Sequence, residues 1–170
     1  NLKRLYLGDN NISDKGIKEL PSADFAGNLS LLDVRYNNIG PEGGLAVVKS
    51  EKFRKLQVLI FQENPVGDET LITLAKAPAF ANLRKLNFYR TDITPKGIKV
   101  LAKSKVLQRV KQLNLARNYL HLESARLLGN TKTLTNIEIL LLFDTGIGDA
   151  GVKAIMESEA FSKLKTLRVT

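Results

Sequence analysis

The chain has 170 residues, of which 44% are hydrophobic, enough for one continuous core in a single domain. It contains no cysteine, which excludes disulfides, thiol catalysis and cysteine-based metal sites, and its formal charge of +9 raises the question of an anionic partner. No apolar run approaches the roughly 18 residues that span a bilayer, so we expect no transmembrane segment.

One apolar pattern recurs along the chain with a constant step of 27 residues, marked by Leu5, Leu32, Leu59, Leu86, Leu113, Leu140 and Leu167. A fixed period of this size is typical of a solenoid, in which each unit buries its apolar face by stacking on the next. The sequence predicts one domain over residues 1–170, with six full units (2–163) and a seventh strand (164–170). Because the end units of solenoids normally carry atypical caps and none is recognisable here, we interpret the chain as a fragment.

Each unit opens with the spacing of Leu2, Leu5 and Leu7, which predicts a short strand with one buried face. A polar residue follows, and we expect it to turn inward and satisfy the backbone of the loops that leave the strands. This position holds Asn10, Asn37, Asn64, Thr91, Asn118 and Thr145. The two threonines have shorter side chains, so we expect weaker hydrogen bonding to the neighbouring loops at these positions.

A helix is expected next in every unit. Pro41 and Pro95 stand where a first helical residue is expected, and acidic residues such as Asp14 and Asp68 lie near helix starts. A second apolar layer then returns the chain to the next strand, at Phe53, Phe80, Leu107, Leu134 and Phe161. Strands stack about 4.8 Å apart whereas helices are about 10 Å wide, so the sequence predicts an α/β horseshoe with a parallel sheet on the concave face and helices on the convex face.

The pattern Leu83-x-x-Leu86-x-Phe88-x-x-Thr91-x-Ile93, followed by Gly97 and Leu101, resembles the leucine-rich repeats of the ribonuclease-inhibitor-like class over the whole chain. Thr70 and Ser124 replace the glycine of that pattern, and Phe25 stands one residue ahead of the aromatic layer, so we expect local changes at these helix starts. The lysine-rich, cysteine-free units also resemble bacterial arrays, including effectors of intracellular pathogens such as Legionella. These resemblances imply a protein-binding module in the bacterial cytoplasm or, after translocation, in the host cytosol, which inhibits a partner enzyme by covering its active site.

The residues between the core leucines are expected to face the concave surface. Contiguous exposed apolar groups usually mark contact surfaces, and tyrosine and arginine dominate interface hot spots. The alternative is that strand propensity alone accounts for some of these side chains. The predicted protein-binding residues are Arg4, Tyr6, Asp33, Arg35, Tyr36, Val58, Ile60, Glu63, Lys85, Asn87, Tyr89, Arg90, Arg117, Leu141, Phe143, Asp144 and Arg168.

Catalysis finds little support in the sequence. His121 is the single histidine and has no cysteine or second histidine with which to complete a metal set or a nucleophile–base pair. The chain also lacks a paired-carboxylate site of the glycosidase kind and a glycine-rich phosphate loop. We therefore expect no enzyme activity, cofactor, metal or small-molecule substrate. The expected partner is a protein, with an enzyme as one candidate, and its contact surface is expected to be acidic and partly apolar, because arginine binds carboxylates through two parallel hydrogen bonds.

Two other classes of function stay open. The array could be the recognition arm of a larger enzyme, such as a ubiquitin ligase effector, or of a cytosolic immune receptor. Lysine clusters in residues 49–55 and 96–111 could instead bind nucleic acid or an acidic lipid surface. Both clusters fall on helix and return segments, where lysines usually form a solvated face, so nucleic acid is the less favoured partner.

Overall fold

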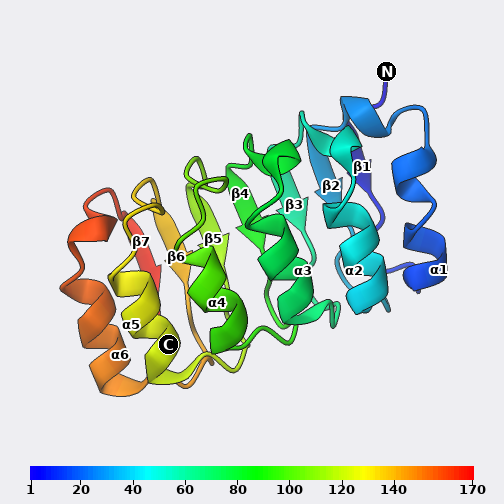
Figure 1. The fold of residues 1–170 in the computed structure, drawn as a ribbon. Helices are drawn as coiled ribbons and strands as arrows, with labels where there is room; N and C mark the ends of the chain where they lie inside the picture. Colours follow the sequence, from blue (N-terminus) through cyan, green and yellow to red (C-terminus); the bar gives the residue numbers. More distant parts are fainter.

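The computed structural model describes residues 1–170 as a stack of parallel strands backed by helices (Figure 1). Seven strands form one parallel sheet in sequential order, and neighbouring strands pair at a step of 27 residues, as Leu5 does with Leu32. The predicted strand register is therefore confirmed along the array. The strands are β1 (Arg4–Tyr6), β2 (Leu31–Asp33), β3 (Val58–Ile60), β4 (Lys85–Asn87), β5 (Gln112–Asn114), β6 (Ile139–Leu141) and β7 (Thr166–Arg168).

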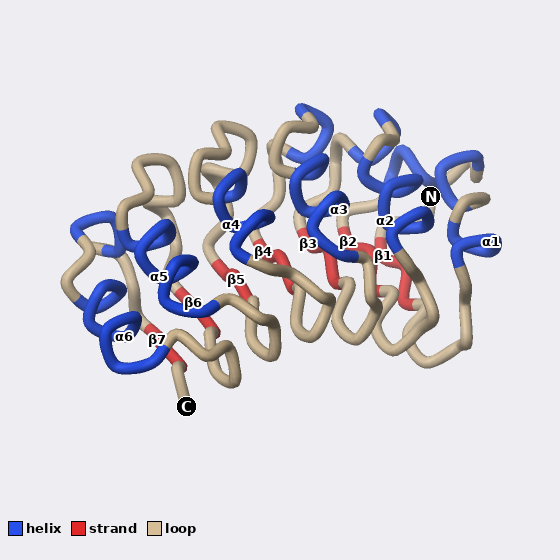
Figure 2. The backbone as a smooth tube through the Cα atoms, turned by 60° about the horizontal axis from the view of Figure 1, so that its bottom comes forward, coloured by secondary structure: helices blue, strands red, loops and turns tan.

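A helix follows each of the first six strands, as predicted, and the helices form a second layer on one face of the sheet. The α-helices are α1 (Asp14–Ile17), α2 (Pro41–Val48), α3 (Gly67–Leu74), α4 (Pro95–Leu101), α5 (His121–Gly129) and α6 (Gly148–Met156). Short 3-10 turns complete the return at Leu20–Ser22, Ala26–Asn28, Glu51–Phe53, Pro78–Phe80 and Glu159–Phe161. Figure 2 shows the strands along the inner side of a gentle curve and the helices along its outer side, because helices need more width per unit than strands. The fold is the predicted α/β solenoid.

One apolar core of 39 buried residues runs the length of the stack. Aromatic rings stack between neighbouring units, with ring centroids 5.5 Å apart for Phe61 and Phe88 and 6.2 Å apart for Phe53 and Phe80. All five predicted residues of the return layer are buried: Phe53, Phe80, Leu107, Leu134 and Phe161. In the first unit Ala26 is the buried residue of this layer and Phe25, one position earlier, is only partly buried.

Asparagine side chains link each strand-exit loop to the unit before it. The buried Asn118 accepts hydrogen bonds at Oδ1 from the backbone N–H groups of Thr91 (3.1 Å) and Ile93 (2.9 Å). Its Nδ2 donates to the carbonyl of Phe88 at 2.6 Å. Asn37 and Asn64 are buried and bond to the preceding unit in the same way. Asn10 departs from the prediction, because it is exposed and its amide donates only to carbonyls of its own turn.

Threonine at the same position changes how the preceding helix begins. Thr91 Oγ1 donates to the carbonyl of Phe88 in its own unit at 2.8 Å, so the hydroxyl makes no bond to the unit before. The backbone compensates, and the Gly67 N–H donates to the Thr91 carbonyl at 2.9 Å. Thr145 shows the same replacement of a side-chain bond by a backbone bond, because the His121 N–H donates to the Thr145 carbonyl at 3.0 Å.

This replacement places the first residues of α3 and α5 in the left-handed region, with φ of 70° for Gly67 and 53° for His121. Thr94, at the equivalent position before α4, has an extended φ of −123°. Both helices carry a replacement of the repeat glycine, Thr70 in α3 and Ser124 in α5, but α6 also begins with a left-handed residue, Gly148 (φ of 62°), and keeps Gly151. The glycine replacements therefore do not account for the altered helix starts. The shorter threonine side chain is the physical cause, since it cannot reach the preceding loop.

His121 occupies a backbone conformation that costs a residue with a Cβ about 1 kcal/mol relative to glycine. We predict that His121→Gly raises the free energy of unfolding by about 1 kcal/mol, as measured by urea denaturation. Thr94→Gly is the matched control, because Thr94 is extended and its hydroxyl accepts from the Lys96 N–H; it should lower stability by about 0.5 kcal/mol or more. A loss of stability in both variants would contradict this account of the helix start.

At the edge where the strands begin, Glu138 lies between two lysines, with Lys111 Nζ at 2.6 Å and Lys165 Nζ at 2.7 Å. These hydrogen bonds lower the pKa of Glu138 from 4.5 to about 2. Because the folded pKa lies below the unfolded one, the stabilisation is present above pH 4.5 and is lost as the pH falls towards 2. We predict a smaller fall in melting temperature between neutral pH and pH 2 for Glu138→Gln than for the unmodified protein; equal falls would contradict the pairing.

Candidate functional site

The strand positions between the core leucines form the concave face, and its first half is partly filled by the protein's own side chains. Asp33 is 2% exposed and Ile60 is 5% exposed. The Arg35 guanidinium binds the Asp33 carboxylate, with Nε 2.8 Å from Oδ2, and this hydrogen bond raises the pKa of Arg35 above its usual value. Ile60 is buried yet lies outside the core cluster, so it is covered from the concave side. The expectation that Asp33 and Ile60 are open to a partner is wrong for this reason.

A chain of hydrogen bonds joins this filled half to the next strands. Gln62 Nε2 donates to the Tyr36 hydroxyl at 2.9 Å, and Gln62 Oε1 accepts from Asn87 Nδ2 at 3.0 Å. Asn87 is only 9% exposed, and its Oδ1 accepts from the Tyr89 N–H at 2.9 Å. Asn87 therefore positions its neighbours and offers little area to a partner, whereas Tyr36 stays exposed. Gln62 is absent from the predicted residues, although it stands in the same row as Arg35 and Tyr89.

The second half of the concave face, from β4 to β7, is open. A shallow pocket of about 110 Å³ lies over β4, β5 and β6. Ile139 and Leu141 form its apolar wall, and its other side chains are those of Lys85, Asn87, Gln112 and Asn114. Lys85 and Leu141 were among the predicted residues. Ile139 was not, although it occupies the same row as Val58, which was.

An aromatic pair lies beside this pocket at the ends of β4 and β6. The ring centroids of Tyr89 and Phe143 are 5.9 Å apart, and the residue between them in the row is the buried Ala116. Arg117 Cζ lies 5.8 Å from the Tyr89 ring centroid, and Arg168 Cζ lies 4.7 Å from that of Phe143. Such cation–π contacts contribute about 0.5–1 kcal/mol at exposed sites. The structure thus brings four of the predicted residues together in one cluster.

Directly after the strand ends lies a row of residues in the left-handed region. Their φ values are between 49° and 60°, and none is glycine: Asp9, Tyr36, Glu63, Arg90, Arg117 and Asp144. Ion pairs join neighbours in the row, with Arg90 2.9 Å from Glu63 and Arg117 3.1 Å from Asp144. The hydrogen bond to Asp144 raises the pKa of Arg117. Exposed ion pairs stabilise a fold only weakly, so pairing offsets only a part of the backbone cost of these residues.

Tyr119 extends the exposed aromatic surface beyond the strands. It is 71% exposed and lines a groove of about 590 Å³ together with Arg90, Arg117, His121 and Asp144. The prediction missed Tyr119 because it considered strand rows, and Tyr119 lies in the following turn. A signal was present, since the other units have small or polar residues or proline there: Asn11, Asn38, Pro65, Asp92 and Gly146.

The remaining predicted residues lie apart from the aromatic cluster. Arg4 and Tyr6 are exposed on β1, with β2 and β3 between them and β4. Val58 is partly buried on β3.

No group of three or more histidine, cysteine, aspartate and glutamate side chains is placed to hold a metal ion. None of the helices is both long enough and apolar enough to cross a membrane.

Comparison with known proteins finds a family match for three segments of the chain. Residues 1–20, 28–48 and 133–156 match the leucine-rich repeat family. No curated protein sequence matches the chain. The matched segments fall on the first, second and sixth units of the array, and the remaining units pair in the same register. Repeats of this family typically serve as binding scaffolds for other proteins.

The ion pair between Arg35 and Asp33 in the filled half of the face leads to a prediction about stability. Arg35→Ala removes the guanidinium from the buried carboxylate of Asp33 and leaves it only the backbone N–H of residue 35, so we expect a loss of about 2 kcal/mol in the free energy of unfolding. Arg90→Ala is the matched control, because Arg90 is exposed and its loss should cost less than about 1 kcal/mol. The measurement is urea denaturation of both variants. Equal losses would mean that Asp33 does not depend on Arg35.

Proposed function

We propose that this chain, a leucine-rich repeat protein, binds a protein partner through the open half of its concave face. The observation that supports this most is the cluster of Tyr89 and Phe143 with Arg117 and Arg168 stacked on their rings. Aromatic and arginine side chains carry most of the binding energy in protein interfaces. The apolar pocket beside the cluster, walled by Ile139 and Leu141, adds area that a partner can bury.

The charges around this cluster indicate the chemistry of the partner. Lys85, Arg117 and Arg168 lie on the open half, and Arg168 forms no ion pair, its Nε donating to the Thr170 carbonyl instead. A guanidinium carries five N–H donors in a planar fork, so Arg117 has donors left after its bond to Asp144. We therefore propose a partner whose contact surface is partly apolar and carries carboxylates.

The finer parts of the proposal rest on the resemblance given above. In the ribonuclease-inhibitor-like class an array of this kind acts by covering its partner, and we propose the same non-catalytic role here, with an enzyme as the partner. We further propose that residues 1–170 act as a single domain and that the protein works as an effector inside cells.

The test begins with recovery of a partner from host and bacterial lysates and continues with the affinity of the purified pair. We predict that Tyr89→Ala and Phe143→Asp each weaken binding by about 30-fold, corresponding to about 2 kcal/mol. Tyr6→Ala is the matched control, because Tyr6 is 60% exposed but lies on β1. It should change the affinity less than about twofold.

Two results would contradict the proposal. One is an affinity that none of these variants changes, which would place the contact elsewhere. The other is binding that falls steeply with salt and survives both cluster variants, as expected for a nucleic acid held by lysines.

A further inference from the structure

Unpaired cations gather on the convex side, where the last turns of α3, α4 and α5 lead into the return segments. They are Lys76, Lys99, Lys103, Lys105, Arg126 and Lys132, and all six are exposed. None takes part in any ion pair of the protein. This surface, which we name the basic stripe, is separate from the concave face.

The basic stripe borders two grooves with apolar floors. The groove between α3 and α4 is about 520 Å³, is rimmed by Lys76, Lys99 and Lys105, and has Val100 and Val106 in its floor. The next groove, between α4 and α5, is about 290 Å³ and has Ala102 and Leu127 in its floor. Lys103 lines both grooves, so the two form one continuous surface.

The cations of the stripe are not needed to satisfy the helix ends. Ser104 Oγ donates to the carbonyl of Ala75 at 2.6 Å, and Thr131 Oγ1 donates to the carbonyl of Ala102 at 2.6 Å. Each hydroxyl thereby occupies a carbonyl at the end of the preceding helix, where a lysine would otherwise donate. The ammonium groups therefore stay free at the rims of the grooves.

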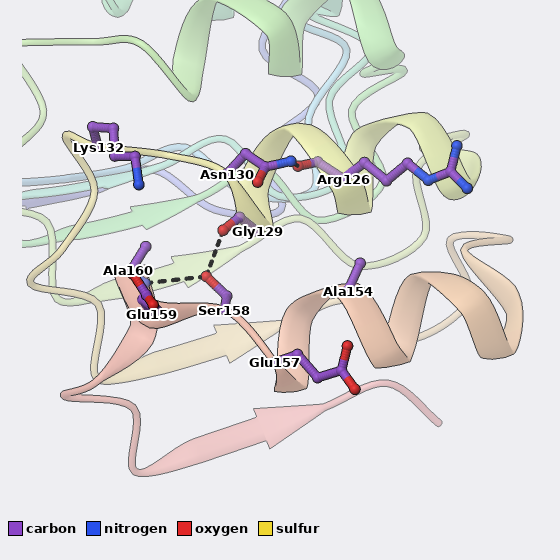
Figure 3. A pocket seen from close by; sticks show the side chains of 9 residues that line it. All are labelled: Arg126, Gly129, Asn130, Lys132, Ala154, Glu157, Ser158, Glu159 and Ala160. Carbon is purple, nitrogen blue, oxygen red and sulfur yellow. Dashed lines mark hydrogen bonds between the residues drawn. The ribbon is translucent and has the colours of Figure 1, made fainter.

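The stripe ends at α6. Figure 3 shows the next groove along, between α5 and α6, where Ser158 donates to the Gly129 carbonyl at 2.6 Å. Glu157 and Glu159 join Arg126 and Lys132 among the residues that line it. These two carboxylates lower the positive charge of the groove between α5 and α6. An anionic ligand is therefore expected over α3, α4 and α5 and not over α6.

We propose that the basic stripe binds an extended acidic peptide segment that carries aliphatic side chains. Adjacent helices lie about 8–10 Å apart, and three residues of an extended chain in the polyproline II conformation span about 9 Å and bring residues i and i+3 to the same face. An apolar residue at every third position would enter successive grooves, and the carboxylates between them would meet the rim lysines. In each groove the apolar floor would contact the aliphatic side chain of the segment, and the unpaired cations at the rim would contact its carboxylates.

The shape and composition of the stripe disfavour the other anionic ligands. The large exposed hydrophobic residues are Leu2, Tyr6, Tyr36, Tyr119 and Met156, and none lines the two grooves. The apolar groups are thus recessed and do not protrude, as they would need to for insertion into a lipid surface. The grooves also contain no aromatic side chain on which a nucleic-acid base could stack.

The test uses fluorescence anisotropy with a labelled peptide of four consecutive Leu-Glu-Glu triplets. We predict that it binds the unmodified protein and that a peptide of four Ser-Glu-Glu triplets binds about tenfold more weakly, because the apolar contacts are lost. Reversing three rim charges with K99E, K103E and K105E together should weaken binding about tenfold or more. The matched control, K49E with K52E and K55E, changes the net charge equally outside the grooves and should leave the affinity within about twofold.

Other outcomes overturn the proposal. They are no binding of the leucine peptide, equal binding of the two peptides, or equal losses in the two triple variants. A DNA duplex or phosphatidylserine vesicles that bind more tightly than the leucine peptide, and lose binding in the groove variant, would assign the stripe to nucleic acid or to a lipid surface instead. The peptide, DNA and vesicle comparisons all use unmodified protein, so they decide the question even if a charge-reversed variant does not fold.

Discussion

The structure depends on the way each unit satisfies the backbone of the unit before it. Asn37, Asn64 and Asn118 accept from N–H groups of the preceding loop and donate to carbonyls of the preceding and their own units. A buried polar backbone group without a partner costs about 1–3 kcal/mol, so these amides fix the stacking of the units. The strand register follows, and with it the rows of side chains on the concave face.

The same constraint explains why the concave face is uneven. In-register stacking brings side chains of successive units into contact. The residue types in each row then determine whether these side chains bury one another or stay accessible to a partner. On β2 the Asp33 carboxylate attracts Arg35, and this half of the face is filled from within. Between β4 and β6 the row passes through the buried Ala116, and the rings of Tyr89 and Phe143 come together there and stay partly exposed. Binding proteins need such open, rigid anchors, because little conformational freedom is then lost on association.

Much of this fold could be predicted from the sequence, because the 27-residue step of the leucines determines which residues pair between strands. The return layer of Phe53 and Phe80 was also predictable from spacing alone. The burial of Asp33 and Ile60 was not, since it results from contacts within the concave face that a repeat pattern does not specify. The exposure of Tyr119 was missed because the prediction considered strand rows and left out the turns.

The binding surface is located most directly by amide hydrogen exchange of the protein with and without its partner. We expect the partner to slow exchange in the segments that leave β4, β5 and β6, at residues 87–92, 114–119 and 141–146, and to leave exchange in the segment after β1 unchanged. Protection confined to the helices, or to the segments that leave β1 and β2, would contradict the assignment of the open concave half as the binding surface.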